Sequence, residues 1–140
     1  MIYGVGLPRT ATRSLEEALN LLGFSGSHFC ILTGGESHRK SHHNFRIDNS
    51  LYEIFEALEN FEINTQDLYI LTDRDLESWK ESIKKWPYSG PPLDEYKKRM
   101  IGKFKNYPNN FLIFNVKEGW EPLCNFLGEE VPTKSFPKIN

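Results

Sequence analysis

The chain has 140 residues, which is the size of a single domain. Apolar residues make up 39% of the chain and charged residues 26%, a balance that fills a globular core and excludes a disordered protein. Seventeen Lys and Arg oppose nineteen Asp and Glu, and the resulting net charge of −2 argues against a generally basic nucleic-acid-binding protein. We therefore expect one domain over residues 1–140, with no nucleic-acid partner.

The sequence carries no visible targeting signal. No apolar run approaches the roughly 20 residues that a membrane span requires. The first residues lack a basic stretch followed by an apolar one, and neither Cys30 nor Cys124 belongs to a CxxC pair. These features predict a cytoplasmic protein without a membrane partner, a disulfide scaffold or a zinc ribbon.

Three short apolar runs predict buried strands, over residues 2–7, 68–72 and 111–116. None alternates strictly with polar residues, which is typical of strands covered on both faces. Each run precedes a segment with apolar residues at helical spacing, and these segments end at Gly23, Pro87 and Gly128. Three strand–helix units in succession predict an α/β fold, a three-layer parallel sheet flanked by helices.

The connecting segments are less regular. We expect residues 24–48, which contain all four histidines, to form one short strand and a long loop. Apolar spacing predicts a helix over residues 50–59. Residues 87–93 are rich in Pro and Gly and predict a turn before a Lys-rich helix, and the tail from Pro132 is expected to be irregular.

The segment GLPRTATRSL, residues 6–15, lies between the first predicted strand and its helix. At such a junction the backbone N–H groups are unpaired and the helix dipole favours an anion. Three hydroxyl groups and two guanidinium groups add donors suited to phosphate or sulfate oxygens. The alternative is that Thr12 or Ser14 only caps the helix while the arginines lie in solvent. We favour the anion site because both arginines fall within five residues.

The loop does not match the nucleotide-binding pattern GxxxxGK[ST]. Counted from Gly6, Ala11 replaces the second glycine, Thr12 the lysine and Arg13 the hydroxyl that binds Mg²⁺. An ordinary ATP- or GTP-dependent kinase is therefore disfavoured.

The same loop resembles the 5′-phosphosulfate loop of sulfotransferases. Residues 68–75, LYILTDRD, are similar to the strand and turn that carry the family's 3′-phosphate arginine, and Ser82 falls where the family places its 3′-phosphate serine. Residues 111–140 resemble the closing segment of the compact branch of these proteins. The resemblance implies a P-loop nucleotide-hydrolase-like sulfotransferase fold, with 3′-phosphoadenosine 5′-phosphosulfate (PAPS) as co-substrate and no metal.

By this resemblance Arg9 stabilises the leaving phosphate, Thr10 and Thr12 cradle the 5′ end, and Arg74 with Ser82 holds the 3′-phosphate. The alternatives are a salt bridge from Arg74 to Asp73 or Asp75, and a solvent-facing Ser82. The expected cofactor-binding residues are Pro8, Arg9, Thr10, Ala11, Thr12, Arg13, Ser14, Arg74 and Ser82.

The resemblance offers two candidates for the general base. His28 resembles a histidine that the compact branch carries after its second strand, and Asp48 precedes the predicted helix at 50–59, where relatives place an acidic residue. We favour Asp48 as the base, with His28 next. With Arg9, these are the expected catalytic residues.

Two departures keep a second function open. Ala11 stands in place of a loop glycine, so its methyl group blocks close backbone approach if that position needs a positive φ, and Arg13 replaces a hydroxyl residue. The first hypothesis is therefore sulfuryl transfer to a hydroxyl or amine of a small-molecule or glycan acceptor. The alternative is a catalytically weak or inactive protein that binds PAPS or its product, 3′-phosphoadenosine 5′-phosphate (PAP).

Two charged regions have simpler interpretations. His38, His42 and His43 form a tract with metal-like spacing, but no Cys or carboxylate completes it, so we expect no metal and favour a loop that covers the site. Residues 80–105 hold eight basic residues against three acidic ones, which is typical of a solvated helix face and also suits steering of an anionic cofactor.

Overall fold

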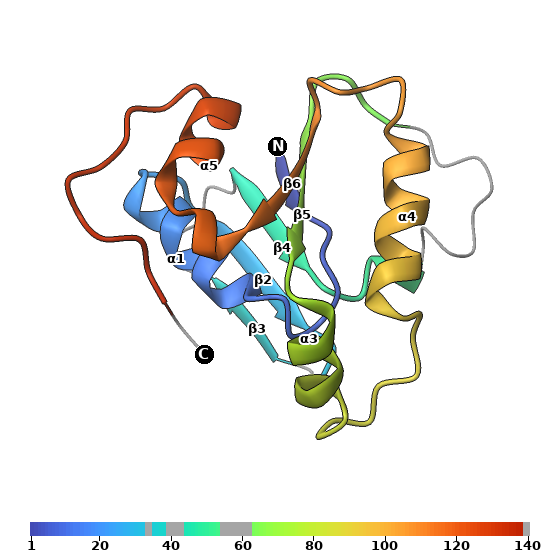
Figure 1. The fold of residues 1–140 in the computed structure, drawn as a ribbon. Helices are drawn as coiled ribbons and strands as arrows, with labels where there is room; N and C mark the ends of the chain where they lie inside the picture. The colour runs from blue at the N-terminus through green and yellow to red at the C-terminus, as the bar shows by residue number, and fades with distance from the viewer. Residues whose placement is uncertain (33–34, 39–43, 54–62, 139–140) are drawn as a thin grey trace.

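The computed structural model describes residues 1–32, 35–38, 44–53 and 63–138, and the side chains of residues 35–38 are not among the features described. Figure 1 shows the strands and helices of the described residues. The strands are β1 (Ile2–Gly4), β2 (Gly26–Cys30), β3 (Gly35–His38), β4 (Phe45–Asp48), β5 (Leu68–Asp73) and β6 (Phe111–Asn115). The helices are α1 (Thr12–Leu21), α3 (Leu76–Ile83), α4 (Leu93–Lys103), the 3₁₀ turn η1 (Val116–Glu118) and α5 (Trp120–Leu127).

The six strands form one sheet in the order β3-β2-β4-β1-β5-β6. The neighbouring strands β2, β4, β1, β5 and β6 are parallel to one another. The edge strand β3 pairs with β2 in the antiparallel direction. The centre of the sheet is β1, where Gly4 lies between Ile47 of β4 and Ile70 of β5. The predicted parallel α/β sheet is confirmed, with one antiparallel strand added at its edge.

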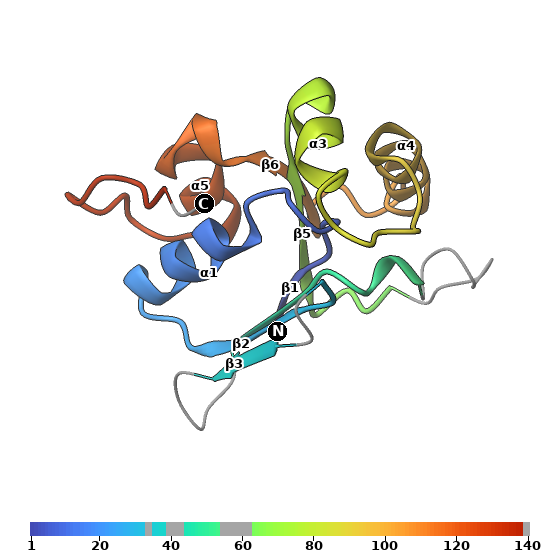
Figure 2. The same cartoon turned by 90° about the horizontal axis from the view of Figure 1, so that it is seen from below.

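Helices cover both faces of the sheet (Figure 2). The apolar side chains of α1 and α5 pack on one face with Phe45, Ile47 and Ile70, while those of α3 and α4 pack on the other with Tyr69 and Leu71. Successive residues of β5 thus contribute to opposite cores, as side-chain alternation along a strand requires. The predicted three-layer arrangement is confirmed.

The prediction of one strand and a long loop over residues 24–48 is wrong. Three strands, β2, β3 and β4, lie in this interval. The strand β4 is only four residues long and lies between β2 and β1 in the sheet. Its residues Phe45 and Ile47 are buried, but two alternating apolar positions are too few to indicate a strand. Most of the helix predicted over residues 50–59 lies outside the described residues. In the part of the chain that is described, no helix is long and apolar enough to cross a membrane.

Candidate functional site

The topology of the sheet predicts a ligand-binding crevice at the carboxyl ends of β1 and β5. These strands are parallel neighbours, but the chain leaves β1 through α1 on one face and leaves β5 through α3 and α4 on the other. Open α/β sheets bind ligands where neighbouring strands diverge in this way. The segments expected to bind the cofactor, residues 6–14 and 74–82, both begin at this point.

The loop after β1 adopts an unusual backbone. Arg9 and Ala11 are the non-glycine residues with positive φ in the described chain, at 68° and 66°. Turns that mix left- and right-handed residues direct consecutive N–H groups into an anion-binding concavity. Position 11 therefore has the positive φ at which the methyl group of an alanine hinders close backbone approach. Its left-handed backbone stores strain at the site.

The start of α1 is not capped by a hydroxyl group. Ala11 is the N-cap and accepts the first helical hydrogen bond from the N–H of Leu15 at 3.2 Å, without a side-chain cap. The alternative in which Thr12 or Ser14 is the cap is therefore wrong. Both side chains are buried inside the first turn, while Arg13 is exposed. The N–H groups of this turn have no intrahelical acceptor, which makes them donors for an anion.

The carbonyl groups of the loop are bound by side chains from the rest of the chain. Each such bond turns a carbonyl oxygen toward the protein and restricts the loop to one conformation. The bonds run from Tyr96 Oη to Val5 O (2.6 Å), from Thr10 Oγ1 to Leu7 O (2.7 Å), from Trp79 Nε1 to Pro8 O (2.8 Å) and from an Arg74 Nη to Arg9 O (3.1 Å).

The loop also lies very close to β5. The Oγ1 atoms of Thr10 and Thr72 are 2.6 Å apart, and both residues are fully buried. A Cβ added to Gly6 would lie 2.0 Å from Thr72 Oγ1. Glycine at position 6 is thus required by the space between the loop and β5.

Three residues expected to bind the cofactor come together at this crevice. Arg9 Nε donates to Ser82 Oγ at 2.8 Å, and Arg74 donates to the Arg9 carbonyl. The guanidinium of Arg9 also lies over the ring of Trp86, 5.8 Å from its centroid. These contacts join the loop after β1 to the loop and helix after β5, across more than 60 residues of sequence.

The simpler alternatives for Arg74 and Ser82 are not what the structure shows. Asp73 pairs with Lys97 of α4 at 2.7 Å, and Asp75 caps α3 by accepting from the N–H of Ser78. Ser82 is buried rather than facing solvent. Hydrogen bonds from the N–H and hydroxyl of Ser78 lower the pKa of the exposed Asp75 carboxyl below its ordinary value.

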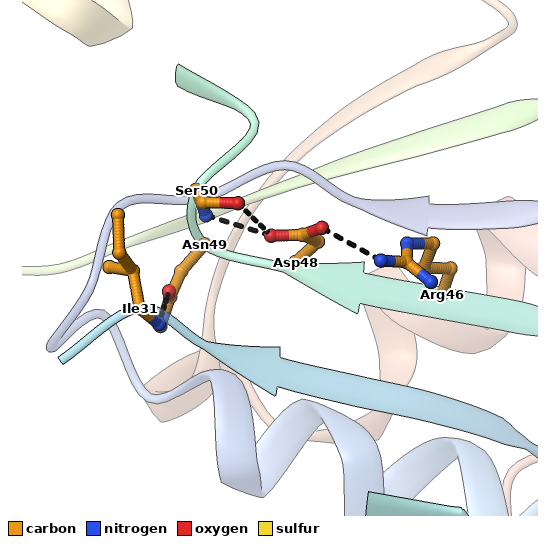
Figure 3. A network of polar contacts seen from close by, with 5 residues as sticks. All are labelled: Ile31, Arg46, Asp48, Asn49 and Ser50. Carbon is orange, nitrogen blue, oxygen red and sulfur yellow. Dashed lines mark hydrogen bonds and ion pairs between the residues drawn. The ribbon is translucent and has the colours of Figure 1, made fainter. Parts of the chain in front are cut away.

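Asp48 lies at the carboxyl end of β4 inside a polar network (Figure 3). Its Oδ1 accepts from the backbone N–H and the hydroxyl of Ser50, and its Oδ2 accepts from Arg46 at 3.1 Å. The neighbouring Asn49 accepts from the N–H of Ile31 and so joins the ends of β4 and β2. The side chain of Asp48 is thus buried and held in one orientation.

His28 lies on the opposite face of the sheet from Asp48. It pairs in register with Ile47, which packs under α1, so its side chain points to the α1 face and that of Asp48 to the α3 and α4 face. Its Nδ1 is 3.2 Å from Glu16 Oε1, and its Nε2 is buried without a hydrogen-bond partner among the described residues. The two candidate bases therefore cannot act on one acceptor from the same side.

The strand spacing also separates the two candidates by distance. Neighbouring strands lie about 4.8 Å apart, which puts the Cα of Asp48 roughly 10 Å from that of Thr72 and the Cα of His28 roughly 16 Å from it. Asp48 is therefore the candidate nearer to the loop after β1.

The comparison with protein families matches residues 89–140 to the family described as the sulfotransferase domain. This segment is similar to the sulfotransferase domain. The match confirms the resemblance read from the sequence, and the α/β fold agrees with it. No curated protein matches the chain.

The matched segment begins in the connection before α4 and includes β6 and α5. It supports the crevice from outside, because Tyr96 and Lys97 of α4 bind Val5 and Asp73. The residues of the crevice itself, 6–14, 74 and 82, precede the match. Their assignment depends on the contacts described above.

Several residues that shape the site carry no clear signal in the sequence. The sequence pattern predicted Thr72 only as the end of a strand. It predicted Trp79 and Trp86 only as part of an apolar helix face. Glu16 gave no signal at all as a partner of His28. The predicted histidine tract cannot be compared with the structure, since His42, His43 and the side chain of His38 lie outside the described features. Among the described residues, no group of three His, Cys, Asp or Glu side chains suits a metal.

Proposed function

We propose that this protein transfers a sulfuryl group from PAPS to a hydroxyl or amine of a small-molecule or glycan acceptor. The similarity of residues 89–140 to the sulfotransferase domain supports sulfuryl transfer in general. The observation that supports the specific co-substrate is the meeting of Arg9, Arg74 and Ser82 around a loop with two left-handed residues. Two guanidinium groups, one hydroxyl and a helix N-terminus form a donor set that suits a ligand with two separate phosphate groups.

In this proposal each part of the crevice has one task. The backbone of residues 10–14 and the hydroxyl of Thr12 hold the 5′ end, and Arg9 places positive charge where negative charge grows on the leaving phosphate. Arg74 and Ser82 bind the 3′-phosphate. Because Ser82 already accepts from Arg9, ligand binding exchanges this hydrogen bond for contacts with the ligand's oxygens.

PAPS supplies an activated sulfur whose bond to the 5′-phosphate oxygen breaks as the bond to the acceptor oxygen or nitrogen forms. The proton of the acceptor must pass to a base on the protein. Asp48 is our first candidate because it lies at the ligand-binding edge of the sheet and nearer to the loop. Its carboxylate oxygens retain lone pairs beyond those that Ser50 and Arg46 engage. His28 is the second candidate, because its Nε2 has no partner in the described chain.

A catalytically weak PAP- or PAPS-binding protein is the second proposed function. Its support is specific: Ala11 carries a methyl group in a left-handed position of the loop, and His28 Nε2 is buried from solvent. In this case the crevice still binds the nucleotide, but transfer is slow or absent.

Calorimetric binding of PAP, compared with AMP, tests the shared part of both proposals. We expect PAP to bind more tightly than AMP, and Arg74→Ala or Ser82→Ala to weaken PAP roughly 10- to 100-fold, the value of a lost charged hydrogen bond. Lys105→Ala, which removes an exposed basic residue of the same region, is the charge-matched control for Arg74→Ala. Equal affinity for PAP and AMP would refute the site.

Sulfate transfer then separates the two functions. Asp48→Asn is expected to abolish transfer from PAPS while PAP binding remains within about twofold, because the residue acts on the acceptor. His28→Gln is the matched variant on the opposite face. If neither variant lowers a measurable rate, another group is the base; if the unaltered protein binds PAP and transfers no sulfate to any acceptor tested, the binding function is correct.

A further inference from the structure

A cleft of about 400 Å³ opens on the α3 and α4 side of the sheet. It lies between the turn that follows β4, the connection before α4 and the first part of α4. Its volume is in the range of small-molecule sites. The residues that line it are Tyr52, Glu53, Ser89, Gly90, Pro91, Glu95 and Arg99.

Among the described residues that line the cleft, the one aromatic side chain, Tyr52, is packed against Tyr88. The rings of Tyr52 and Tyr88 meet edge to face at 5.7 Å, and the Tyr88 hydroxyl donates to the carbonyl of Pro91 at 2.7 Å. A Cβ on Gly90 would lie 2.5 Å from the Tyr88 hydroxyl and 2.7 Å from a ring carbon of Tyr52. The connection before α4 is therefore packed closely against the turn after β4, and the cleft between them is preformed.

This aromatic packing continues to the nucleotide crevice. Tyr88 also packs edge to face on Trp79 at 5.8 Å, and Trp79 donates to the Pro8 carbonyl. On its other side, Tyr52 follows Asp48 by four residues, a stretch of chain that spans at most about 14 Å. The cleft and the proposed base thus lie on the same face of the sheet, and the Cα atoms of Tyr52 and Asp48 are no more than about 14 Å apart.

The charges of the cleft leave one carboxylate available. Arg99 lies 3.6 Å from Glu95, whereas Glu53 has no ion-pair partner among the described residues. Burial, together with the Glu53 carboxylate, raises the pKa of the Tyr52 phenol above its ordinary value, so this phenol stays neutral beside the carboxylate.

We propose that the cleft is the acceptor site and that it takes a hydroxylated amine, whose ammonium group lies between Glu53 and the ring of Tyr52. A carboxylate next to an aromatic face is a favourable site for an ammonium ion. The hydroxyl of the acceptor then points toward the end of β4, where Asp48 receives its proton as the sulfuryl group is transferred. This inference depends on the proposed sulfotransferase activity for its catalytic part, but the binding part stands alone.

Two phenols that differ only in charge test the proposal. The probes are 4-(aminomethyl)phenol and 4-methylphenol, and their binding to the full chain is measured by calorimetry with and without saturating PAP. We expect the amine to bind at least about fivefold more tightly, the effect of one partly exposed ion pair with a cation–π contact. Glu53→Gln should remove this preference and change 4-methylphenol binding by less than about twofold.

Glu77→Gln is the matched control, because it removes an exposed glutamate of α3 that lies outside the cleft. It should leave the preference for the amine unchanged. Equal binding of the two probes by the unaltered protein, or a preference that survives Glu53→Gln, would overturn the cleft as an amine site. These results are independent of PAP binding: failure of PAP to bind while the amine preference is present would refute the nucleotide proposal alone.

Discussion

Replacing Ala11 with glycine should stabilise this protein, although glycine normally destabilises a helix terminus or loop by adding freedom to the unfolded chain. Ala11 has φ 66° and ψ 39°, which is the left-handed region. In this region the Cβ of an L-residue crowds the following carbonyl oxygen, and glycine has no Cβ.

The magnitude follows from two opposing terms. Removing the left-handed penalty stabilises the fold by about 1–2 kcal/mol. The larger conformational entropy of glycine in the unfolded chain offsets about 0.5–1 kcal/mol of this. The expected net gain is about 0.5–1 kcal/mol, which raises Tm by roughly 2–3 °C in a chain of this size.

Thermal unfolding monitored by circular dichroism measures the effect, and Ala18→Gly is the matched control. Ala18 is fully buried in the interior of α1, so its replacement loses about 1 kcal/mol of helix propensity and about 0.8 kcal/mol of methyl burial. The two substitutions should shift Tm in opposite directions. A fall in Tm for Ala11→Gly would show that the position is not left-handed in the folded protein, and the account of the loop would then be wrong.

Three further predictions concern the supports of the site. Gly6→Ala should cost about 1–3 kcal/mol through overpacking, whereas Gly102→Ala, whose Cβ would meet nothing within 4 Å, should stabilise α4 by roughly 1 kcal/mol in the same urea titrations. Trp79→Phe should lower the free energy of unfolding by about 1–3 kcal/mol, since it leaves a buried loop carbonyl without its donor; an unchanged value would contradict that bond. The pKa of Asp75 is lowered in the folded protein, so its ionised carboxylate stabilises α3 at any pH above the ordinary carboxyl pKa. This stabilisation is lost as the pH falls through the pKa of Asp75 in the folded protein. The Tm difference between the unaltered protein and Asp75→Ala should therefore shrink on acidification, and Ser78→Ala should weaken this pH dependence.

Local sequence patterns were sufficient for the main helices and strands. The apolar runs at β1, β5 and β6 predicted strands because side chains covered on both faces leave no polar alternation. Glycines just beyond the helices located their ends, and Gly128 indeed follows α5 with φ 72°. The short strands β3 and β4 gave no comparable signal, because β4 contributes only Phe45 and Ile47 to the core.

The amino-acid sequence by itself determined the kind of chemistry at the loop after β1: guanidinium and hydroxyl donors at the start of a helix. Only the tertiary structure decided that Arg9 contacts Ser82, that Thr10 contacts Thr72, and that Asp48 and His28 face opposite sides of the sheet. The physical reason is the distance along the sequence between the residues that interact. Helix and strand formation depend on neighbours within a few residues, whereas these contacts depend on the order in which parallel strands pair, and the insertion of β4 between β2 and β1 sets that order.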